Sequence, residues 1–205
     1  MLSLQTQNCQ IMSTATLALD IYTEMTPNPA TMKFVLNKML LPNRIAEFGD
    51  IAAATKSPLA TELFGFPYVK SVFIMNNFVT VTKQADVEWE DVIPTLKEFI
   101  KKYVQEEGVI VTDDFNESNR NSAVDENETE TEKKIKDVLE NYVKPAVEMD
   151  GGFIQFKSYH EGKVTLSLQG SCSGCPSSMI TLKAGIEGLL KRLVPEVHEV
   201  EAEAK

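Results

Sequence analysis

The most informative pattern in this sequence is a pair of cysteines three residues apart, Cys172 and Cys175, in the run Gly170-Ser-Cys-Ser-Gly-Cys-Pro176. Thiolates are soft ligands that suit iron–sulfur clusters or zinc. Gly170 and Gly174 permit a tight backbone that would turn both sulfurs the same way. Pro176 fits the first position of a helix, and a helix N-terminus facing the sulfurs would favour their thiolate form. We therefore predict that this loop holds a metal centre.

Two thiolates are too few ligands for such a centre. A structural zinc takes four ligands, and an iron–sulfur cluster generally takes four cysteines. The third cysteine, Cys9, has no partner motif, and we interpret it as a dispensable thiol. His160 is predicted in a hairpin turn and His198 in the last strand, both as ordinary surface residues. A second copy of the chain, related by a two-fold axis, would supply the missing ligands.

Three functions from different classes fit this pair of cysteines. An iron–sulfur carrier would hold a cluster at a dimer seam and pass it on. A thiol–disulfide oxidoreductase would use Cys172 as the attacking thiolate and Cys175 as the resolving thiol. Oxidoreductases of the thioredoxin type differ from this pattern. They have a proline between the two cysteines and a βαβ unit before them, whereas here Pro176 follows the pair and no βαβ unit precedes it. A zinc-bridged dimer would be structural, and the ligand count leaves it open.

Composition and charge narrow the class of protein. The chain has 205 residues and a net charge of -10, with 8 acidic side chains and 1 basic one between Asp113 and Glu132. It has no basic stripe for nucleic acid and no apolar run of about 20 residues for a membrane. Three cysteines make no disulfide framework, which indicates a reducing compartment.

The N-terminal stretch carries no basic residue before Lys33, so it resembles neither a secretory signal nor a mitochondrial leader. Met12 is an alternative start to Met1.

We predict an α+β protein with two small domains joined by an acidic flexible linker. The expected divisions are a disordered leader at 1–16, an accessory domain at 17–112, the linker at 113–132 and a cysteine-bearing domain at 133–205.

In the first domain, alternation and turn residues predict four strands and two helices. Ser57 and Pro58 form a helix start, and Pro94 is expected to strain or offset the start of the second helix. Asn76 and Asn77 suit a tight hairpin. The predicted strands are residues 17–23, 31–36, 69–74 and 78–83, and the second helix covers 89–103.

In the second domain, a helix over 132–147 is predicted to stop at Asp150-Gly151-Gly152. A hairpin of residues 153–158 and 163–169, the cysteine loop, a helix from Pro176 to Leu193 and an edge strand at 197–202 follow. We expect a three-stranded sheet covered by two helices, with both cysteines outside the apolar stripes.

The second domain resembles the NifU-like C-terminal domain of the Nfu family of iron–sulfur cluster carriers, from about Ile135 to Val200. The first domain resembles the Nfu N-terminal domain. The residues that carry the likeness are Asp150-Gly151-Gly152, Gly170 to Pro176, Ser178, Met179, Thr181, Leu182 and Ile186-Glu187 in the second, and Thr26 to Pro29, Lys33-Phe34, Ser57 to Ala60, Leu63-Phe64, Val69 to Phe73, Phe78 to Lys83 and Trp89 in the first.

This resemblance implies a [4Fe–4S] cluster shared by two protomers and held by Cys172 and Cys175 of each, with Gly170, Gly174 and Pro176 shaping the loop. It implies no enzymatic activity. The expected partners are a second protomer, an upstream cluster scaffold and apo iron–sulfur proteins that receive the cluster by thiolate exchange. The first domain would help to engage these recipients. This domain resembles the one in mitochondrial members of the family, but the expected import leader is missing, so we expect the bacterial cytoplasm, with the mitochondrial matrix as the alternative.

Overall fold

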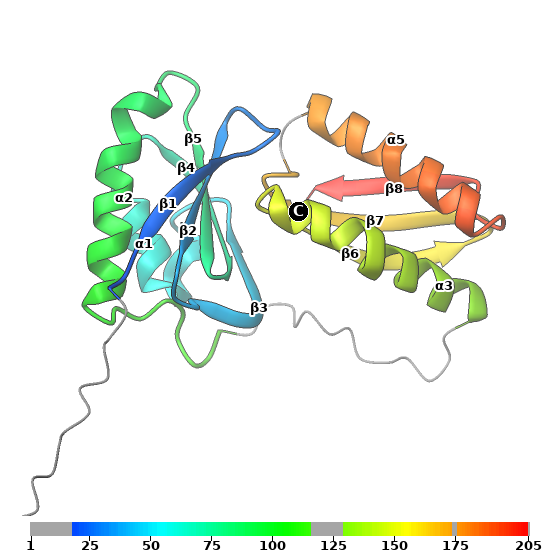
Figure 1. Cartoon of the computed structure of the whole chain (residues 1–205), viewed down its shortest axis with the longest axis horizontal. Coiled ribbons are helices and arrows are strands. Elements are labelled where there is room, and N and C mark those ends of the chain that lie inside the picture. The colour runs from blue at the N-terminus through cyan, green and yellow to red at the C-terminus, as the bar shows by residue number, and fades with distance from the viewer. Residues whose placement is uncertain (1–17, 116–128, 174–175, 205) are drawn as a thin grey trace, which may run out of the picture.

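The chain forms two sheets, each covered by helices on one face (Figure 1). The computed structural model describes residues 18–115, 129–173 and 176–204, with the backbone alone at 176–178 and 204. We refer to residues 18–115 as the N-terminal unit and to residues 129–204 as the C-terminal unit. The mixture of helices and antiparallel strands confirms the predicted α+β class. No helix among the described residues is long and apolar enough to cross a membrane.

The N-terminal unit is a five-stranded antiparallel sheet in the order β1-β2-β5-β4-β3. The predicted strand at 31–36 and the predicted hairpin are confirmed, and Asn76 adopts the positive φ of 48° that the turn requires. The first strand begins later than expected. The bounds are β1 Ile21–Met25, β2 Thr31–Leu36, β3 Leu41–Phe48, β4 Val69–Asn76, β5 Phe78–Lys83, a 3-10 turn at Ala53–Lys56, α1 Pro58–Leu63 and α2 Trp89–Gln105.

Strand β3 was not predicted, because its sequence begins Leu41-Pro42-Asn43-Arg44 and lacks alternation there. The register between β3 and β4 shifts between Leu41 and Ile45, and Asn43 has a φ of 57°. A bulge of this kind interrupts the alternation of inward and outward side chains by which a strand is recognised in a sequence. From Ile45 onward the strand is regular and forms one edge of the sheet.

Helices α1 and α2 cover the face of the sheet that carries Phe34, Val72 and Val81, all fully buried. Ser57 caps α1 as predicted, since its hydroxyl accepts a hydrogen bond from the backbone N–H of Ala60. Helix α2 begins at Trp89 and continues through Pro94, so the proline does not displace its start. Pro94 is the sixth residue of α2, beyond the first turn, so the helix continues across it at the cost of one backbone donor.

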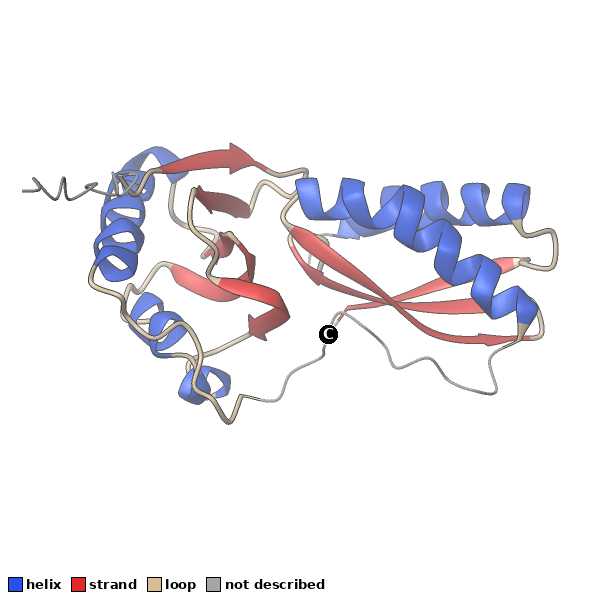
Figure 2. Ribbon diagram, turned by 60° about the horizontal axis from the view of Figure 1, so that its bottom comes forward, coloured by secondary structure: helices blue, strands red, loops and turns tan. Residues whose placement is uncertain are grey.

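The C-terminal unit is the predicted three-stranded sheet, in the order β6-β7-β8, with helices on one face (Figure 2). Strand β8 pairs in parallel with β7 at the sheet edge. Val164, Leu166 and Leu168 face the helices as expected, whereas Leu193 is 44% exposed and lies off the predicted apolar stripe. The bounds are α3 Glu130–Val138, α4 Lys144–Met149, β6 Gly152–His160, β7 Lys163–Gly170, α5 Pro176–Leu193 and β8 Glu199–Ala204.

The first helical segment of this unit is not the single α-helix predicted over 132–147. A π-helical turn at Leu139–Val143 separates α3 from α4. Pro145 lacks the N–H that would continue the α-helical ladder, which accounts for the interruption. Helix α4 ends at Asp150, and Gly151 follows with a φ of 79°, as predicted for the Asp150-Gly151-Gly152 corner.

The ends of the predicted acidic linker belong to the folded units. Phe115 is buried in the N-terminal core and its carbonyl accepts a hydrogen bond from Arg44. Thr129 and Glu132 form a capping box at the start of α3. Residues 116–128, like the predicted leader at 1–16, lie outside the described residues.

Candidate metal centre

The cysteine loop starts as a tight turn at the end of β7. Gly170 has a φ of 68°, in the left-handed region that favours glycine. The backbone N–H and the hydroxyl of Ser173 both donate to the Gly170 carbonyl, at 3.1 and 2.8 Å. The backbone N–H of Ser171 donates to the carbonyl of Gly151 at 3.3 Å. The loop is therefore fixed against the corner that ends α4.

Cys172 is buried, with 7% of its surface exposed, and it packs in the same hydrophobic cluster as Ile186 and Leu168. This corrects the expectation that the cysteine lies outside the apolar packing. The reason is the approach of the 151–152 backbone, since a β-carbon added at Gly152 would lie 2.6 Å from the Cys172 sulfur. The absence of a side chain at Gly152 provides the space for the thiol.

Burial raises the pKa of the Cys172 thiol from 9.0 to about 11. Loss of solvation is the main cause, because the thiolate is the charged form. The Ser171 hydroxyl lowers the pKa, and the carboxyl groups of Asp150 and Glu47 raise it further. For Cys172 this shift opposes the predicted preference for the thiolate; Cys175 lies outside the described residues.

The other predicted loop residues are described only in part. Cys175 and Gly174 lie outside the described residues, as does Cys9. Pro176 is the first residue of α5, as predicted. Cys172 therefore lies four positions before the first residue of the helix.

The two histidines lie away from the loop. His160 is the last residue of β6, with 86% of its side chain exposed, and its Nε2 is 4.0 Å from a carboxylate oxygen of Glu161. His198 is exposed and lies beside the same hairpin turn, where its backbone N–H donates to Gly162. Among the described residues, no three His, Cys, Asp or Glu side chains form a group that could hold a metal ion.

Three polar side chains of the N-terminal unit contact this region, two at the loop and one at the Gly151 corner, and the sequence did not indicate them. The Oε1 atom of Glu47 accepts a hydrogen bond from the Gly170 N–H at 2.8 Å. It also lies 3.3 Å from the Ser173 hydroxyl, as the more distant of the two acceptors for that single proton. The side-chain amide of Asn28 donates to the Ser171 carbonyl at 3.2 Å. The hydroxyl of Thr80 donates to the Gly151 carbonyl at 2.8 Å. No local sequence signal links these residues to the loop.

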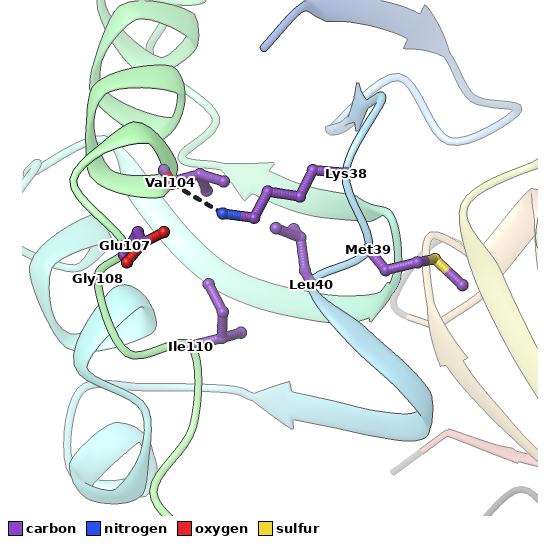
Figure 3. Close-up of a pocket in the computed structure, with 7 residues that line it drawn as sticks. All are labelled: Lys38, Met39, Leu40, Val104, Glu107, Gly108 and Ile110. Carbon is purple, nitrogen blue, oxygen red and sulfur yellow. Dashed lines mark hydrogen bonds between the residues drawn. The ribbon is translucent and has the colours of Figure 1, made fainter. Parts of the chain in front are cut away.

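A separate hollow of about 150 Å³ lies in the N-terminal unit between the β2–β3 connection and the end of α2 (Figure 3). The ammonium of Lys38 extends into it and donates to the Val104 carbonyl at 3.5 Å. The rest of its lining is Met39, Leu40, Glu107, Gly108 and Ile110. None of its lining residues belongs to the cysteine loop.

Two family models match this chain. The model described as "Scaffold protein Nfu/NifU N terminal" covers residues 21–107, and the model described as "NifU-like domain" covers residues 135–201. The second match includes both cysteines of the loop.

Known proteins match along most of the chain. The human protein named "NFU1 iron-sulfur cluster scaffold homolog, mitochondrial" is 40% identical over 182 residues, which cover 88% of this chain and 70% of that protein. "NifU-like protein 4, mitochondrial" of Arabidopsis thaliana is 37% identical, over 89% of this chain and 65% of that protein. The chain thus spans about two thirds of the length of these relatives. A solved NifU-like protein from Saccharomyces cerevisiae covers 54% of this chain and 94% of its own, with a TM-score of 0.39 and 25% identity.

Proposed function

Because the chain belongs to the Nfu family of iron–sulfur cluster scaffold proteins, we propose that it carries a [4Fe–4S] cluster on Cys172 and Cys175 and delivers it to apo-proteins. The observation that supports this most directly is that the NifU-like match contains the Cys-x-x-Cys loop between β7 and α5. The cluster is cargo in this role. One cluster is delivered for each one loaded, so the protein acts stoichiometrically and not as an enzyme.

The proposed ligand set requires two protomers. Each chain offers two thiolates in this loop, and a cluster generally takes four. Two loops related by a two-fold axis would complete the set with identical half-sites. Homodimerisation then accompanies cluster binding, with Gly170 and Gly174 allowing the loop geometry and Pro176 starting α5.

Delivery would proceed by thiolate exchange. A recipient thiol loses its proton, and its sulfur forms a bond to iron as the bond from Cys172 or Cys175 to that iron breaks. The released carrier thiolate then takes up a proton. Repeating this step for each ligand moves the cluster without any gain or loss of electrons. The partners are an upstream scaffold that supplies the cluster and apo iron–sulfur proteins that accept it.

The names of the relatives give information on the cellular compartment in which this protein acts. Both the human and the Arabidopsis relatives are named as mitochondrial, and nothing supports the bacterial cytoplasm that we expected. We therefore propose the mitochondrial matrix for this chain. Fractionation of cells that produce the native protein would test this, and recovery with cytosolic markers alone would contradict it.

The decisive experiment is anaerobic reconstitution with iron and sulfide, followed by measurement of iron, sulfide, zinc and molar mass on one chromatographic peak. About four irons and four sulfides per dimer are expected. Cys172→Ser and Cys175→Ser should each abolish this loading. Cys9→Ser is the matched control, because that thiol has no partner motif, and it should load normally.

Other outcomes favour the other functions. One tightly held zinc per dimer with no stable cluster would indicate a structural bridge. A Cys172–Cys175 disulfide that cycles readily, with neither metal bound, would indicate a thiol–disulfide oxidoreductase. Regain of activity by an apo-form [4Fe–4S] enzyme, mixed with the loaded protein, would establish delivery.

A further inference from the structure

The face of the five-stranded sheet that is free of helices carries a row of side chains that crosses all five strands. The strand register aligns them as Glu24 on β1, Lys33 on β2, Thr80 on β5, Phe73 on β4 and Glu47 on β3. Cross-strand neighbours point to the same face of a sheet, so the five side chains form one continuous line. We call these five residues the docking row.

Lys33, Thr80 and Phe73 of the docking row are buried although no helix of the N-terminal unit covers them. Lys33 is 7% exposed, Thr80 is 1% exposed and Phe73 is 2% exposed. Lysine and threonine are seldom buried without polar partners. The element that covers them is the C-terminal unit, at the end of its sheet that carries the cysteine loop (Figure 1).

Four of the five residues contact this end of the C-terminal unit. The Lys33 ammonium donates to the carbonyl of Met149 at 2.9 Å while it pairs with Glu24 at 2.9 Å. Thr80 donates a hydrogen bond to the Gly151 carbonyl, and Glu47 accepts one from the Gly170 N–H. A β-carbon at Gly170 would lie 3.0 Å from Cδ1 of Phe73, so that ring lies directly against the loop.

An apolar cluster that includes residues of both units lies beside the row. Phe153 of β6 is 1% exposed and packs with Val35, Ile45, Phe73, Met75 and Phe78 of the N-terminal unit. Phe153 does not belong to the cluster that forms the core of its own unit. Its burial therefore depends on contact between the units, and the interface has both an apolar centre and a polar line.

We propose that the docking row is a binding surface for residues 170–173 of the cysteine loop in the same chain, and that it covers them until the carrier is loaded. The loop is bonded on both sides of Cys172, since Gly170, Ser171 and Ser173 all contact N-terminal side chains. A cluster shared by two protomers requires a second copy of the loop to approach this one. The docked N-terminal unit and the second loop compete for the same place, so loading requires the units to separate.

This closed state gives the N-terminal unit a function that the carrier role alone does not assign. Docking would protect the thiol of the unloaded carrier from oxidants and from other metals. Cluster binding would release the docking row, which would then be free only in the loaded protein. The inference rests on the proposed function for this consequence alone, because docking itself can be tested on the protein without a cluster.

The test uses the full-length protein with Cys9→Ser and Cys175→Ser, in which Cys172 is the single thiol. Alkylation by iodoacetamide, followed by intact mass, reports the accessibility of Cys172. Small-angle scattering reports the separation of the units without reference to the thiol. Thr80→Val removes the hydrogen bond to Gly151 without changing size, and Phe153→Ala removes the apolar contact without touching the core of either unit.

We expect both variants to alkylate Cys172 at least about tenfold faster than the reference and to have a larger radius of gyration. Glu98→Gln, on the exposed face of α2, is the matched surface control and should change neither reading. Unchanged alkylation and unchanged scattering in both docking variants would overturn the proposal. So would a dimeric reference protein without a cluster, because the row would then hold the loop of another chain.

Discussion

The backbone N–H of Gly170 donates a hydrogen bond of 2.8 Å to the carboxylate of Glu47, a residue 123 positions earlier in the chain. This contact joins the edge strand of one sheet to the first residue of the cysteine loop. Hydrogen bonds to a charged acceptor are stronger than neutral ones and contribute about 1.5–3 kcal/mol when the groups are buried. Glu47 therefore couples the site to the unit that does not carry it.

Glu47→Gln should weaken this contact without abolishing it. The amide oxygen still accepts from Gly170, but the bond is no longer charge-assisted, and we expect docking to lose about 1 kcal/mol. Hydrogen exchange of the peptide that contains the Gly170 amide should quicken by roughly fivefold. Glu98→Gln serves as the control here too, and equal exchange in the two variants would show that Glu47 does not hold the loop.

Gly152→Ala should destabilise the C-terminal unit. The new methyl group would lie 2.6 Å from the Cys172 sulfur and 2.9 Å from the Gln169 carbonyl oxygen, both closer than packing allows. Overpacking of this kind costs about 1–3 kcal/mol, which would lower the urea midpoint of unfolding.

Gly185→Ala is the matched control for that substitution. Gly185 lies inside α5 with nothing within 4 Å of an added β-carbon. This variant should be more stable by about 0.5–1 kcal/mol, because alanine favours a helix interior. A Gly152→Ala protein as stable as the reference would contradict the close approach of the corner to the sulfur.

Cys172 should make the closed form sensitive to alkaline pH. Its pKa is raised from 9.0 to about 11 by burial, so the folded protein retains a proton that the unfolded chain releases. Deprotonation of Cys172 therefore leaves the free energy of unfolding unchanged below pH 9.0 and lowers it as the pH rises toward 11. Urea unfolding across this range, with Cys172→Ser as the control that lacks the titrating group, measures the effect. An equal decline in both proteins would assign it to other groups.

Iron removal should return the loaded protein to monomers. In the proposed arrangement the cluster is the bond between protomers, so an iron chelator removes the only bridge. Molar mass measured before and after chelation should fall by half. A dimer that survives complete loss of iron would show that protein contacts, rather than the cluster, join the two chains.

Much of this fold could be predicted because its local signals agree. The alternation of Val164 to Gln169, the helix stop at Gly151 and the cap at Ser57 each determine an element through short-range physics. The loop that carries Cys172 could be located for the same reason. Strand β3 escaped prediction because its bulge at Leu41–Ile45 removes the alternation.

The burial of Cys172 could not be predicted, since it depends on contacts between distant segments. Gly152 makes room for the sulfur, and Glu47 and Asn28 hold the loop from another unit. None of these residues carries a motif. The same holds for the docking row, whose five members become neighbours only through the pairing of five strands.

The contacts between the units share a further property. Lys33, Thr80, Asn28 and Glu47 each use a side chain of the N-terminal unit, and each meets a main-chain atom of the C-terminal unit. Apart from the Ser173 hydroxyl, the polar contacts to the loop are therefore made to its main chain and do not depend on which side chains it carries. Substitution of either cysteine would leave these main-chain hydrogen bonds in place. Side chains of the loop that bind the cluster can therefore change while the loop stays docked on the N-terminal unit.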